Sequence, residues 1–353
     1  MIALALLVGG CGSDDGGDDT TEAPPAAGLV SGVEGVSIAS TDDPVAFDWV
    51  DVARLREAAG IPADATKAAT NSRWSIPVGY ALGDPLGNLL FSQEFGFDPM
   101  TGDRTVGAGT APNRATFYGG VDAGDVPGAL DDLGYDETDG FYANGKEGAI
   151  LPGSPSLTGT NRFAIDGDDL SVGAFEAPVG AAIGRGGDAL ATLDGVAAAS
   201  DCLGADALMA NVRDPEDGAA DEVALQAIGV EGPGDDGVVP EVLCAVGEPG
   251  ESLGDVADCM DGNFNDGGVD PFSNRPFSDL LGKVEVSEGE TDGAAWVRAI
   301  VSPPVDQPVG ILFNLDSKTS LAGPLGGDPY AFSGGTVTPA QIEALEDQLP
   351  DVC

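Results

Sequence analysis

Apolar and polar positions follow short strand-like and helix-like patterns along most of the chain. Apolar residues at every second position predict strands, and apolar residues three or four apart predict helices. In the middle of the chain the predicted strands are 115–121, 140–143, 161–166, 170–175 and 207–212. The predicted helices are 125–133 and, with interruptions, 178–199. The Asp166-Gly167-Asp168 turn joins two of these strands as a hairpin. With the brief strand at 140–143 left aside, we interpret this series as the order β-α-β-β-α-β.

The last third of the chain repeats this pattern loosely. Its predicted strands are 222–230, 241–247, 283–287, 294–302 and 309–315, and its predicted helices are 253–264 and 338–349. The final helix has the clearest boundaries: Thr338 is the N-cap, Pro339 is the first helical residue, Gln341 completes a capping box and Pro350 ends the helix.

The first third is more helical. Residues 48–59 predict a helix that Gly60 and Pro62 end, and residues 78–91 have a helical tendency. Residues 102–112 are rich in glycine and predict a loop. We therefore expect an N-terminal, mostly helical section at 29–112.

Together these elements predict an α+β fold with antiparallel sheets and helices on one face. The β-α-β-β-α-β order resembles the ferredoxin-like arrangement. This resemblance implies two such units, one at 113–214 and one at 215–353, after the N-terminal section.

The charge balance excludes one class of partner. The chain has 60 acidic and 14 basic residues, with a formal net charge of −46. Nucleic-acid binding requires a basic surface, so we expect no nucleic-acid partner. We expect a folded chain with this net negative charge to be repelled by anionic membrane surfaces and to stay solvated and dispersed. The alternative is a surface that attracts cations or a basic partner.

The chain contains no histidine. This excludes Ser-His-Asp and Cys-His nucleophile pairs, and it removes the commonest ligand of zinc, copper and haem. We predict no cofactor, and any catalysis has to depend on carboxylate, Lys, Tyr or Ser side chains. Adjacent acids are the candidates for a glycoside-hydrolase pair: Asp131-Asp132, Asp168-Asp169 and Asp235-Asp236. Their spacing favours none of them, so we predict no catalytic residue.

Two further features suggest a site. Oxygen-bearing side chains alternate at Asp261, Asn263 and Asn265, and with Asp270 they are a candidate calcium loop. The glycine of such a loop comes one place late, however, and Phe272 stands where a bidentate Glu is required. The alternative is a solvated loop. The aromatic side chains could stack on a sugar, but at 6% of the chain we expect them in the core.

Four cysteines follow the N-terminal one: Cys202, Cys244, Cys259 and Cys353. An even number in an exported protein predicts two disulfides, with three ways to pair. A local Cys244–Cys259 bridge is plausible because a strand and the next helix carry them. That leaves Cys202–Cys353 as a long-range link.

The N-terminus resembles a bacterial-type lipoprotein. An apolar run at 2–8 leads into Val8-Gly9-Gly10-Cys11, which matches a lipobox, although no basic residue precedes the run. The resemblance implies that residues 1–10 are a signal peptide and that Cys11 carries the lipid. Residues 11–28 are rich in Gly, Asp, Thr and Pro and predict a disordered tether.

These observations predict an extracytoplasmic protein, lipid-anchored to the cell membrane, with a binding or structural role and no catalysis. Its partner would be a protein of the envelope. The alternatives are a solute-binding lipoprotein of a transporter and a glycan hydrolase that uses carboxylates. The long strand–helix series expected of solute-binding proteins is missing from the predicted elements.

Overall fold

The computed structural model describes residues 28–40, 44–62, 72–83, 94–149, 160–215, 219–271, 273–318, 320–321 and 324–326. The lipobox, the tether, the helix predicted at 338–349 and Cys353 lie outside these residues.

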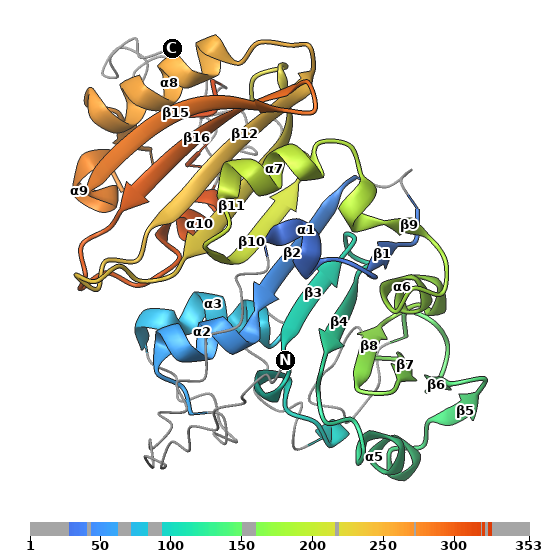
Figure 1. The fold of residues 1–353 in the computed structure, drawn as a ribbon. Helices are drawn as coiled ribbons and strands as arrows, with labels where there is room; N and C mark the ends of the chain where they lie inside the picture. The colour runs from blue at the N-terminus through green and yellow to red at the C-terminus, as the bar shows by residue number, and fades with distance from the viewer. Residues whose placement is uncertain are drawn as a thin grey trace, which may run out of the picture.

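One antiparallel sheet of twelve strands runs through the molecule, in the order β15-β16-β12-β11-β10-β2-β3-β4-β8-β7-β6-β5 (Figure 1). Its first seven strands along the chain are β2 (Ala46–Asp51), β3 (Arg104–Ala108), β4 (Ala115–Gly119), β5 (Asp136–Thr138), β6 (Phe141–Ala143), β7 (Arg162–Asp166) and β8 (Asp169–Gly173). The others are β10 (Ala207–Arg213), β11 (Val223–Glu231), β12 (Glu241–Pro249), β15 (Lys283–Thr291) and β16 (Ala294–Ser302).

Two smaller strand pairs lie outside this sheet. They are β1 (Ser37–Ile38) with β9 (Asp188–Ala189), and β13 (Val269–Asp270) with β14 (Arg275–Pro276). The helices are α1 (Leu29–Gly32), α2 (Val52–Ala59), α3 (Ser75–Ala81), α5 (Val126–Asp132), α6 (Glu176–Ala182), α7 (Val196–Leu203), α8 (Gly254–Asn265), α9 (Phe277–Leu281) and α10 (Ile311–Asp316). Short 3-10 turns are η1 (Ser72–Trp74), η2 (Pro99–Thr101) and η3 (Leu190–Thr192).

Strands β2 and β10 join the two halves of the large sheet, and we call their pairing the joint. The two strands are antiparallel, with Asp48 of β2 opposite Asn211 of β10. On one side of the joint lie β3 to β8, and on the other lie β11, β12, β15 and β16. The two halves therefore share one continuous hydrogen-bonded ladder rather than forming separate sheets.

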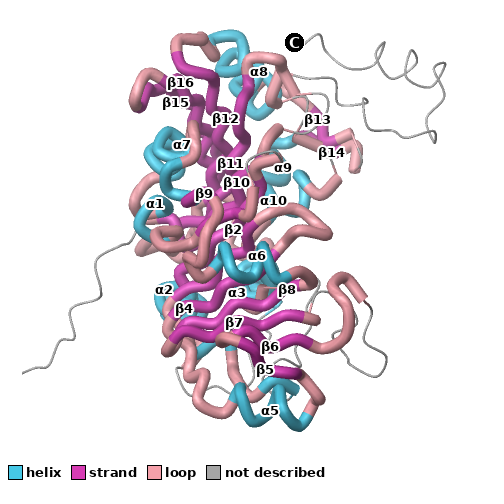
Figure 2. The backbone as a smooth tube through the Cα atoms, turned by 90° about the vertical axis from the view of Figure 1, so that its right-hand side faces the viewer, coloured by secondary structure: helices cyan, strands magenta, loops and turns pink. Residues whose placement is uncertain are grey.

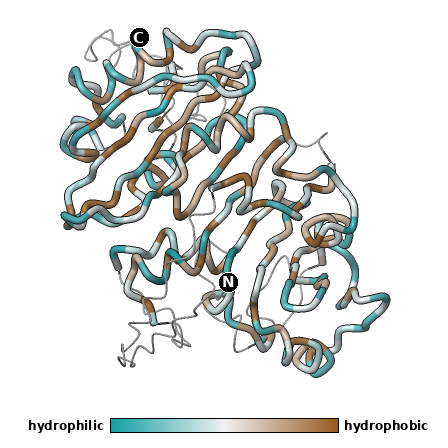
Figure 3. Tube along the Cα trace, in the orientation of Figure 1, coloured by the Kyte–Doolittle hydropathy of each residue, from teal (hydrophilic) through white to brown (hydrophobic). Residues whose placement is uncertain are grey.

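Helices cover both faces of this sheet, because successive side chains of a strand point to opposite sides. Trp49 of β2 belongs to the apolar cluster that includes residues of α1, α6 and α7, on what we call the α7 face. Val50, its neighbour, belongs to the apolar cluster that includes residues of α2, α3, α8, α9 and α10, on the α10 face. Seen from the side, α7 and α10 lie on opposite sides of β10 and β11 (Figure 2). Apolar residues are concentrated in the strands and the helices that cover them (Figure 3).

The predicted α+β class with antiparallel strands is confirmed. Most predicted strands and helices are present, with ends that move by a few residues. The stretch 178–199 is divided, because α6 ends at Ala182, β9 and η3 follow, and α7 begins at Val196. The arrangement differs from the prediction in two ways. The helices lie on both faces, and β2 and β3 separate β4 from β10 in the sheet, which is not the order of a ferredoxin-like unit. The section predicted as mostly helical supplies these two central strands, and it also holds α2 and α3.

Three local predictions were wrong. Part of the glycine-rich stretch at 102–112 is β3. The helix expected at 48–59 begins only at Val52, because Asp51 ends β2 and its side chain accepts a hydrogen bond from Arg54 N at 3.0 Å. Residues 309–315 were expected as a strand, but 311–315 belong to α10 instead.

Candidate functional site

The α10 face carries a cluster of polar side chains at the joint, and we call it the joint cluster. Its five members are Asp48 of β2, Arg114 before β4, Tyr80 of α3, Arg213 of β10 and Asp316 of α10. Polar groups within a packed core require partners, since an unpaired buried charge costs several kcal/mol. The hydrogen bonds and ion pairs among these five side chains therefore define the candidate site.

Asp48 lies between Phe47 and Trp49, and the alternation of the strand turns its carboxylate to the α10 face. The residue is 1% exposed. Its Oδ1 forms an ion pair with Nη2 of Arg114, and Asp48 raises the pKa of that guanidinium. Oδ2 is buried and accepts no hydrogen bond from the described residues. The carboxylate thus has one strong partner and one free oxygen.

A glycine makes room for this ion pair. Gly107 of β3 stands opposite Asp48 in the ladder. A Cβ at this position would lie 2.0 Å from Nη2 of Arg114 and 2.8 Å from Oδ2 of Asp48. Any larger residue would displace one or both charged groups.

Tyr80 is held over the joint because two hydroxyl groups of the sheet bind the end of α3. Thr105 Oγ1 donates to the carbonyl of Ala81 at 2.7 Å, and the Tyr118 hydroxyl donates to the carbonyl of Leu82 at 3.0 Å. These bonds satisfy carbonyls that a helix leaves without partners at its C-terminus. Burial, followed by the charge of Asp48, raises the pKa of Tyr80 to about 12. The phenol therefore keeps its proton and can act as a donor.

The second ion pair of the cluster joins β10 to α10. Arg213 Nη2 and Gln226 Nε2 both donate to Oδ1 of Asp316, at 2.5 Å and 2.7 Å. Gln226 lies opposite Arg213 on β11 and is 1% exposed. Its Oε1 is buried and has no hydrogen-bond partner in the described structure. Asp316 also contributes to the raised pKa of Tyr80, which places the phenol near both pairs.

The N-terminus of α10 is fixed by a third buried carboxylate. Glu241 of β12 is 1% exposed and accepts hydrogen bonds from three backbone N–H groups, those of Gly310, Ile311 and Leu312, at 2.7, 3.0 and 2.8 Å. Burial raises the pKa of Glu241 to about 7, although the three N–H groups lower it. This contact also explains why a helix begins at Ile311, since it satisfies the N–H groups at the start of α10.

The joint cluster has the chemistry of a binding site for a hydrogen-bond donor. Oδ2 of Asp48 and Oε1 of Gln226, which adjoins the cluster, are buried acceptors without a hydrogen-bond partner among the described residues. Acceptors in a desolvated setting favour ammonium, guanidinium or amide groups. Sequence reasoning missed this cluster. An isolated Asp between Phe47 and Trp49 was the one available signal, and it was interpreted as the start of a helix.

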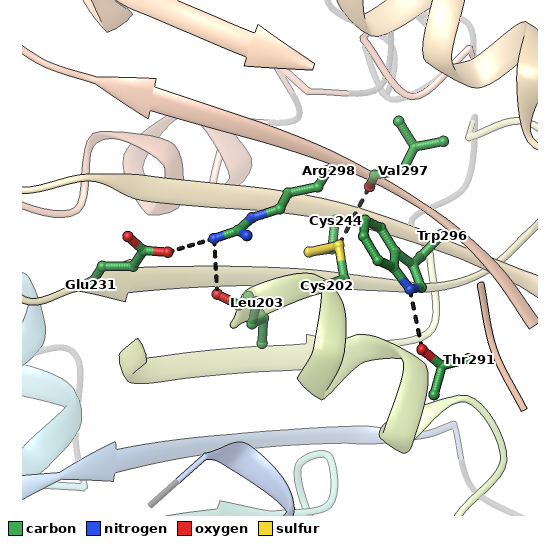
Figure 4. The surroundings of a disulfide bond; sticks show 8 residues. All are labelled: Cys202, Leu203, Glu231, Cys244, Thr291, Trp296, Val297 and Arg298. Carbon is green, nitrogen blue, oxygen red and sulfur yellow. Dashed lines mark hydrogen bonds and ion pairs between the residues drawn. A yellow bond between two sulfur atoms is a disulfide. The ribbon is translucent and has the colours of Figure 1, made fainter. Parts of the chain in front are cut away.

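On the α7 face of the sheet, a disulfide attaches helix α7 to strand β12. Cys202 of α7 is bonded to Cys244 of β12, both fully buried (Figure 4). Beside it, Arg298 of β16 donates to Glu231 Oε1 at 2.5 Å and to the carbonyl of Leu203 at 3.3 Å. These contacts attach the C-terminal end of α7 to three neighbouring strands.

This bond corrects the predicted pairing. Cys244 is bonded to Cys202 and not to Cys259, so the local bridge is wrong, and the link from Cys202 to Cys353 is wrong with it. Cys259 is also in a disulfide. The prediction failed because α8, which carries Cys259, lies on the α10 face, whereas Cys244 points to the α7 face.

The predicted calcium residues are not brought together as ligands. Asp261, Asn263 and Asn265 lie within α8 rather than in a loop, and Asn265 Nδ2 donates to Asp261 Oδ1 at 2.8 Å. Asp270 is buried, and its carboxylate accepts from Ser320 Oγ at 2.7 Å and from Ser273 N at 3.0 Å. In the described ranges no three His, Cys, Asp or Glu side chains are placed to hold a metal ion.

The other candidates are dispersed. The adjacent acids lie on three different elements: at the end of α5, at the β7–β8 turn and in the loop before β12. Most of the aromatic residues are core residues, as expected: Trp49, Trp74, Phe95 and Phe97 are at most 3% exposed. Trp296 is partly buried, and its indole donates to Thr291 Oγ1 at 3.3 Å (Figure 4).

Comparisons with protein-family models, with curated proteins and with solved structures give no match. None of the helices in the described part of the chain is long and apolar enough to cross a membrane.

Proposed function

We propose that this chain is a lipid-anchored protein of the cell envelope that acts by binding a partner outside the cytoplasm. The observation that carries the proposal is the buried Cys202–Cys244 disulfide. Disulfides persist in oxidising compartments and are rare in the cytosol. A core disulfide therefore supports export, and the lipobox at Cys11 supplies the matching anchor. One acyl chain alone binds membranes weakly, so we expect Cys11 to carry more than one.

The acidic surface fits this role. Nine of the ten arginines donate hydrogen bonds to backbone carbonyls or carboxylates of their own chain, which leaves few cations to offset the surface acids. Such a body is held off an anionic membrane surface and remains dispersed on its tether. A basic envelope protein is the partner that this charge favours.

Replacing the proposed lipid-bearing residue tests the anchor directly. In a bacterial host that acylates lipoproteins, the wild-type chain should sediment with membranes and Cys11→Ala should move to the soluble extracytoplasmic fraction. Ser13→Ala, two residues further along, is the matched control and should stay with the membranes. If Cys11→Ala sediments with membranes as fully as the wild type, the anchor is refuted.

A solute-binding role is the second candidate, and the joint cluster favours it. Pockets often form where two parts of a fold meet, and this joint carries two acceptors without partners. The solute would present an ammonium, guanidinium or amide group. A thermal-shift screen of small amines and amides should then give saturable stabilisation of the wild type, and Asp48→Asn should abolish it. Stabilisation that is equal in Asp48→Asn would contradict this role.

A further inference from the structure

Strand β15 forms one outer edge of the large sheet (Figure 1). It pairs with β16 on one side, and in the described part of the chain no strand lies on its other side. With nine residues it is as long as the strands at the centre of its half of the sheet. An edge strand of this length presents a row of backbone donors and acceptors with which another chain can pair.

The turn after β15 determines which of its backbone groups point outward. Asp292 and Gly293 form this turn with positive φ, and Thr291 stands opposite Ala294. In a two-residue turn of this kind the flanking residues exchange both hydrogen bonds, and bonded and non-bonded pairs then alternate along the ladder. The residues whose N–H and C=O groups point away from β16 are therefore Val284, Val286, Glu288 and Glu290.

One end of this edge is covered and the other is open. Asn265, at the end of α8, donates from Nδ2 to the Val284 carbonyl at 3.5 Å. The outward backbone groups of Val286, Glu288 and Glu290 form no hydrogen bond with any described residue. The side chains of Glu288 and Glu290 are exposed. The second half of β15, which we call the free edge, can therefore pair with a further strand.

Carboxylates surround the free edge. In the ladder, Glu288 and Glu290 stand opposite apolar residues of β16. Helix α8 packs beside β15 (Figure 1), and its Asp258, Asp261 and Asn265 recur at intervals of three and four residues. They therefore share one face of α8, and the contact of Asn265 with β15 turns that face toward the edge. None of the four carboxylates forms an ion pair with a described residue.

We propose that the free edge of β15 is a docking site for an extended segment of an envelope protein, rich in lysine or arginine, that adds to the sheet as a further strand. Backbone hydrogen bonds hold the segment on β15. Basic side chains at alternate positions lie beside Glu288, Glu290 and the carboxylates of α8. The inference rests on the proposed function, because it specifies where this chain binds the basic partner expected there.

Charge disfavours the other occupants of the free edge. A second copy of the chain would bring the Glu288 and Glu290 side chains of two edges together, and like charges on neighbouring strands are destabilising. The terminal segments of the chain, 1–27 and 327–353, contain no lysine or arginine. Charged side chains on an edge prevent self-pairing. The same carboxylates attract a strand of opposite charge.

Binding of a synthetic peptide to the full chain tests the docking site. The probe is a blocked, fluorescently labelled peptide of alternating lysine and threonine, about as long as β15, and its anisotropy reports binding. We expect saturable binding to the wild type. The control peptide has the same sequence with methyl groups on its central backbone nitrogens, so it keeps the charge but cannot pair. It should bind roughly tenfold more weakly, since several backbone hydrogen bonds are lost.

Two double variants separate the edge from the overall charge. Glu288→Gln with Glu290→Gln should weaken binding of the lysine–threonine peptide roughly fivefold. Asp131→Asn with Asp132→Asn removes the same charge from the exposed end of α5, far from β15 in the sheet order, and should bind as the wild type does. Equal weakening in the two double variants, or equal affinity for the methylated peptide, would show that charge alone binds the peptide and would overturn the docking site. Absence of binding to the wild type would overturn it as well.

Hydrogen exchange resolved to single residues locates the bound peptide. The peptide should slow exchange of the amides of Val286, Glu288 and Glu290. The amides of Ser287 and Gly289, which point to β16 in the ladder, should be unchanged. Protection at another surface without this alternation would overturn the docking site.

The outcome is distinguishable from that of the anchor test. If the peptide does not bind and Cys11→Ala leaves the membranes, the docking site is wrong and the anchor stands. If the alternating protection is found and Cys11→Ala stays with the membranes, the docking site stands and the anchor is wrong.

Discussion

The Asp48 carboxylate pairs with the Arg114 guanidinium directly over Gly107, at the strand pairing that unites the two halves of the sheet. The absence of a side chain at Gly107 is what admits both charged groups to the same space. The joint cluster, the position of α3 and the contact with α10 all lie around this pair.

A methyl group at position 107 should disrupt the ion pair. Gly107→Ala places a Cβ 2.0 Å from Arg114 Nη2, so the guanidinium has to move and leave Asp48 buried with a weakened partner. We expect a loss of about 2 to 3 kcal/mol in the free energy of unfolding, measured by denaturant titration. Gly128→Ala in the exposed part of α5, where no atom lies within 4 Å, is the control and should stabilise by about 0.5 to 1 kcal/mol. A Gly107→Ala chain as stable as the wild type would refute the tight fit.

Global stability should depend on Glu241 with a defined sign. Because the pKa of Glu241 is raised in the folded chain, its contribution is fully present below the pKa of the unfolded chain and is lost as pH rises toward about 7. The wild type should therefore lose up to roughly 3 kcal/mol relative to Glu241→Gln between pH 4.5 and pH 8. The difference between the two chains is the relevant quantity, since other acids titrate equally in both. A difference that stays constant with pH would show that Glu241 has an ordinary pKa.

Two disulfides should be found by peptide mapping under non-reducing conditions. One is Cys202–Cys244. For the second we predict Cys259–Cys353, because Cys259 is in a disulfide and the lipoprotein proposal assigns Cys11 to the lipid. Removing the first by Cys202→Ala with Cys244→Ala should cost about 2 to 4 kcal/mol, since that bridge closes a sequence separation of 42 residues. A peptide linking Cys244 to Cys259 would contradict the fold.

Stability should increase with ionic strength. A formal net charge of −46 repels itself, and most arginines are engaged within the fold. Salt screens this repulsion, with a Debye length that falls from about 30 Å at 0.01 M to about 3 Å at 1 M. We expect the melting temperature to rise steadily over this range of potassium chloride, and far less with sucrose at matched osmolality. A melting temperature that falls with salt would show that surface ion pairs dominate instead.

The sequence predicts the elements of this fold better than their arrangement. The hairpin at 161–175 and helix α8 follow from local periodicity, and both are present. The order of the sheet depends on β2, which pairs with β3 and with β10, both far from it in the chain, and no local pattern encodes those pairings.

The joint cluster shows the same limit. Residues 309–315 have the composition of a strand, yet Glu241, about seventy residues earlier, supplies the acceptor that makes them a helix. The carboxylate and its N–H partners meet through the fold alone. Pairing of the cysteines failed for a related reason, because the face toward which Cys244 points is set by its register with β11 and β16.

The intact mass of the protein, extracted in detergent from the membranes of its own host, tests the central claim most directly. The account predicts a mass that matches cleavage before Cys11 plus acyl chains, and a rise of about four hydrogens after reduction of two disulfides. A full-length, unmodified mass with free thiols would contradict the lipid anchor, the export and the disulfide framework together.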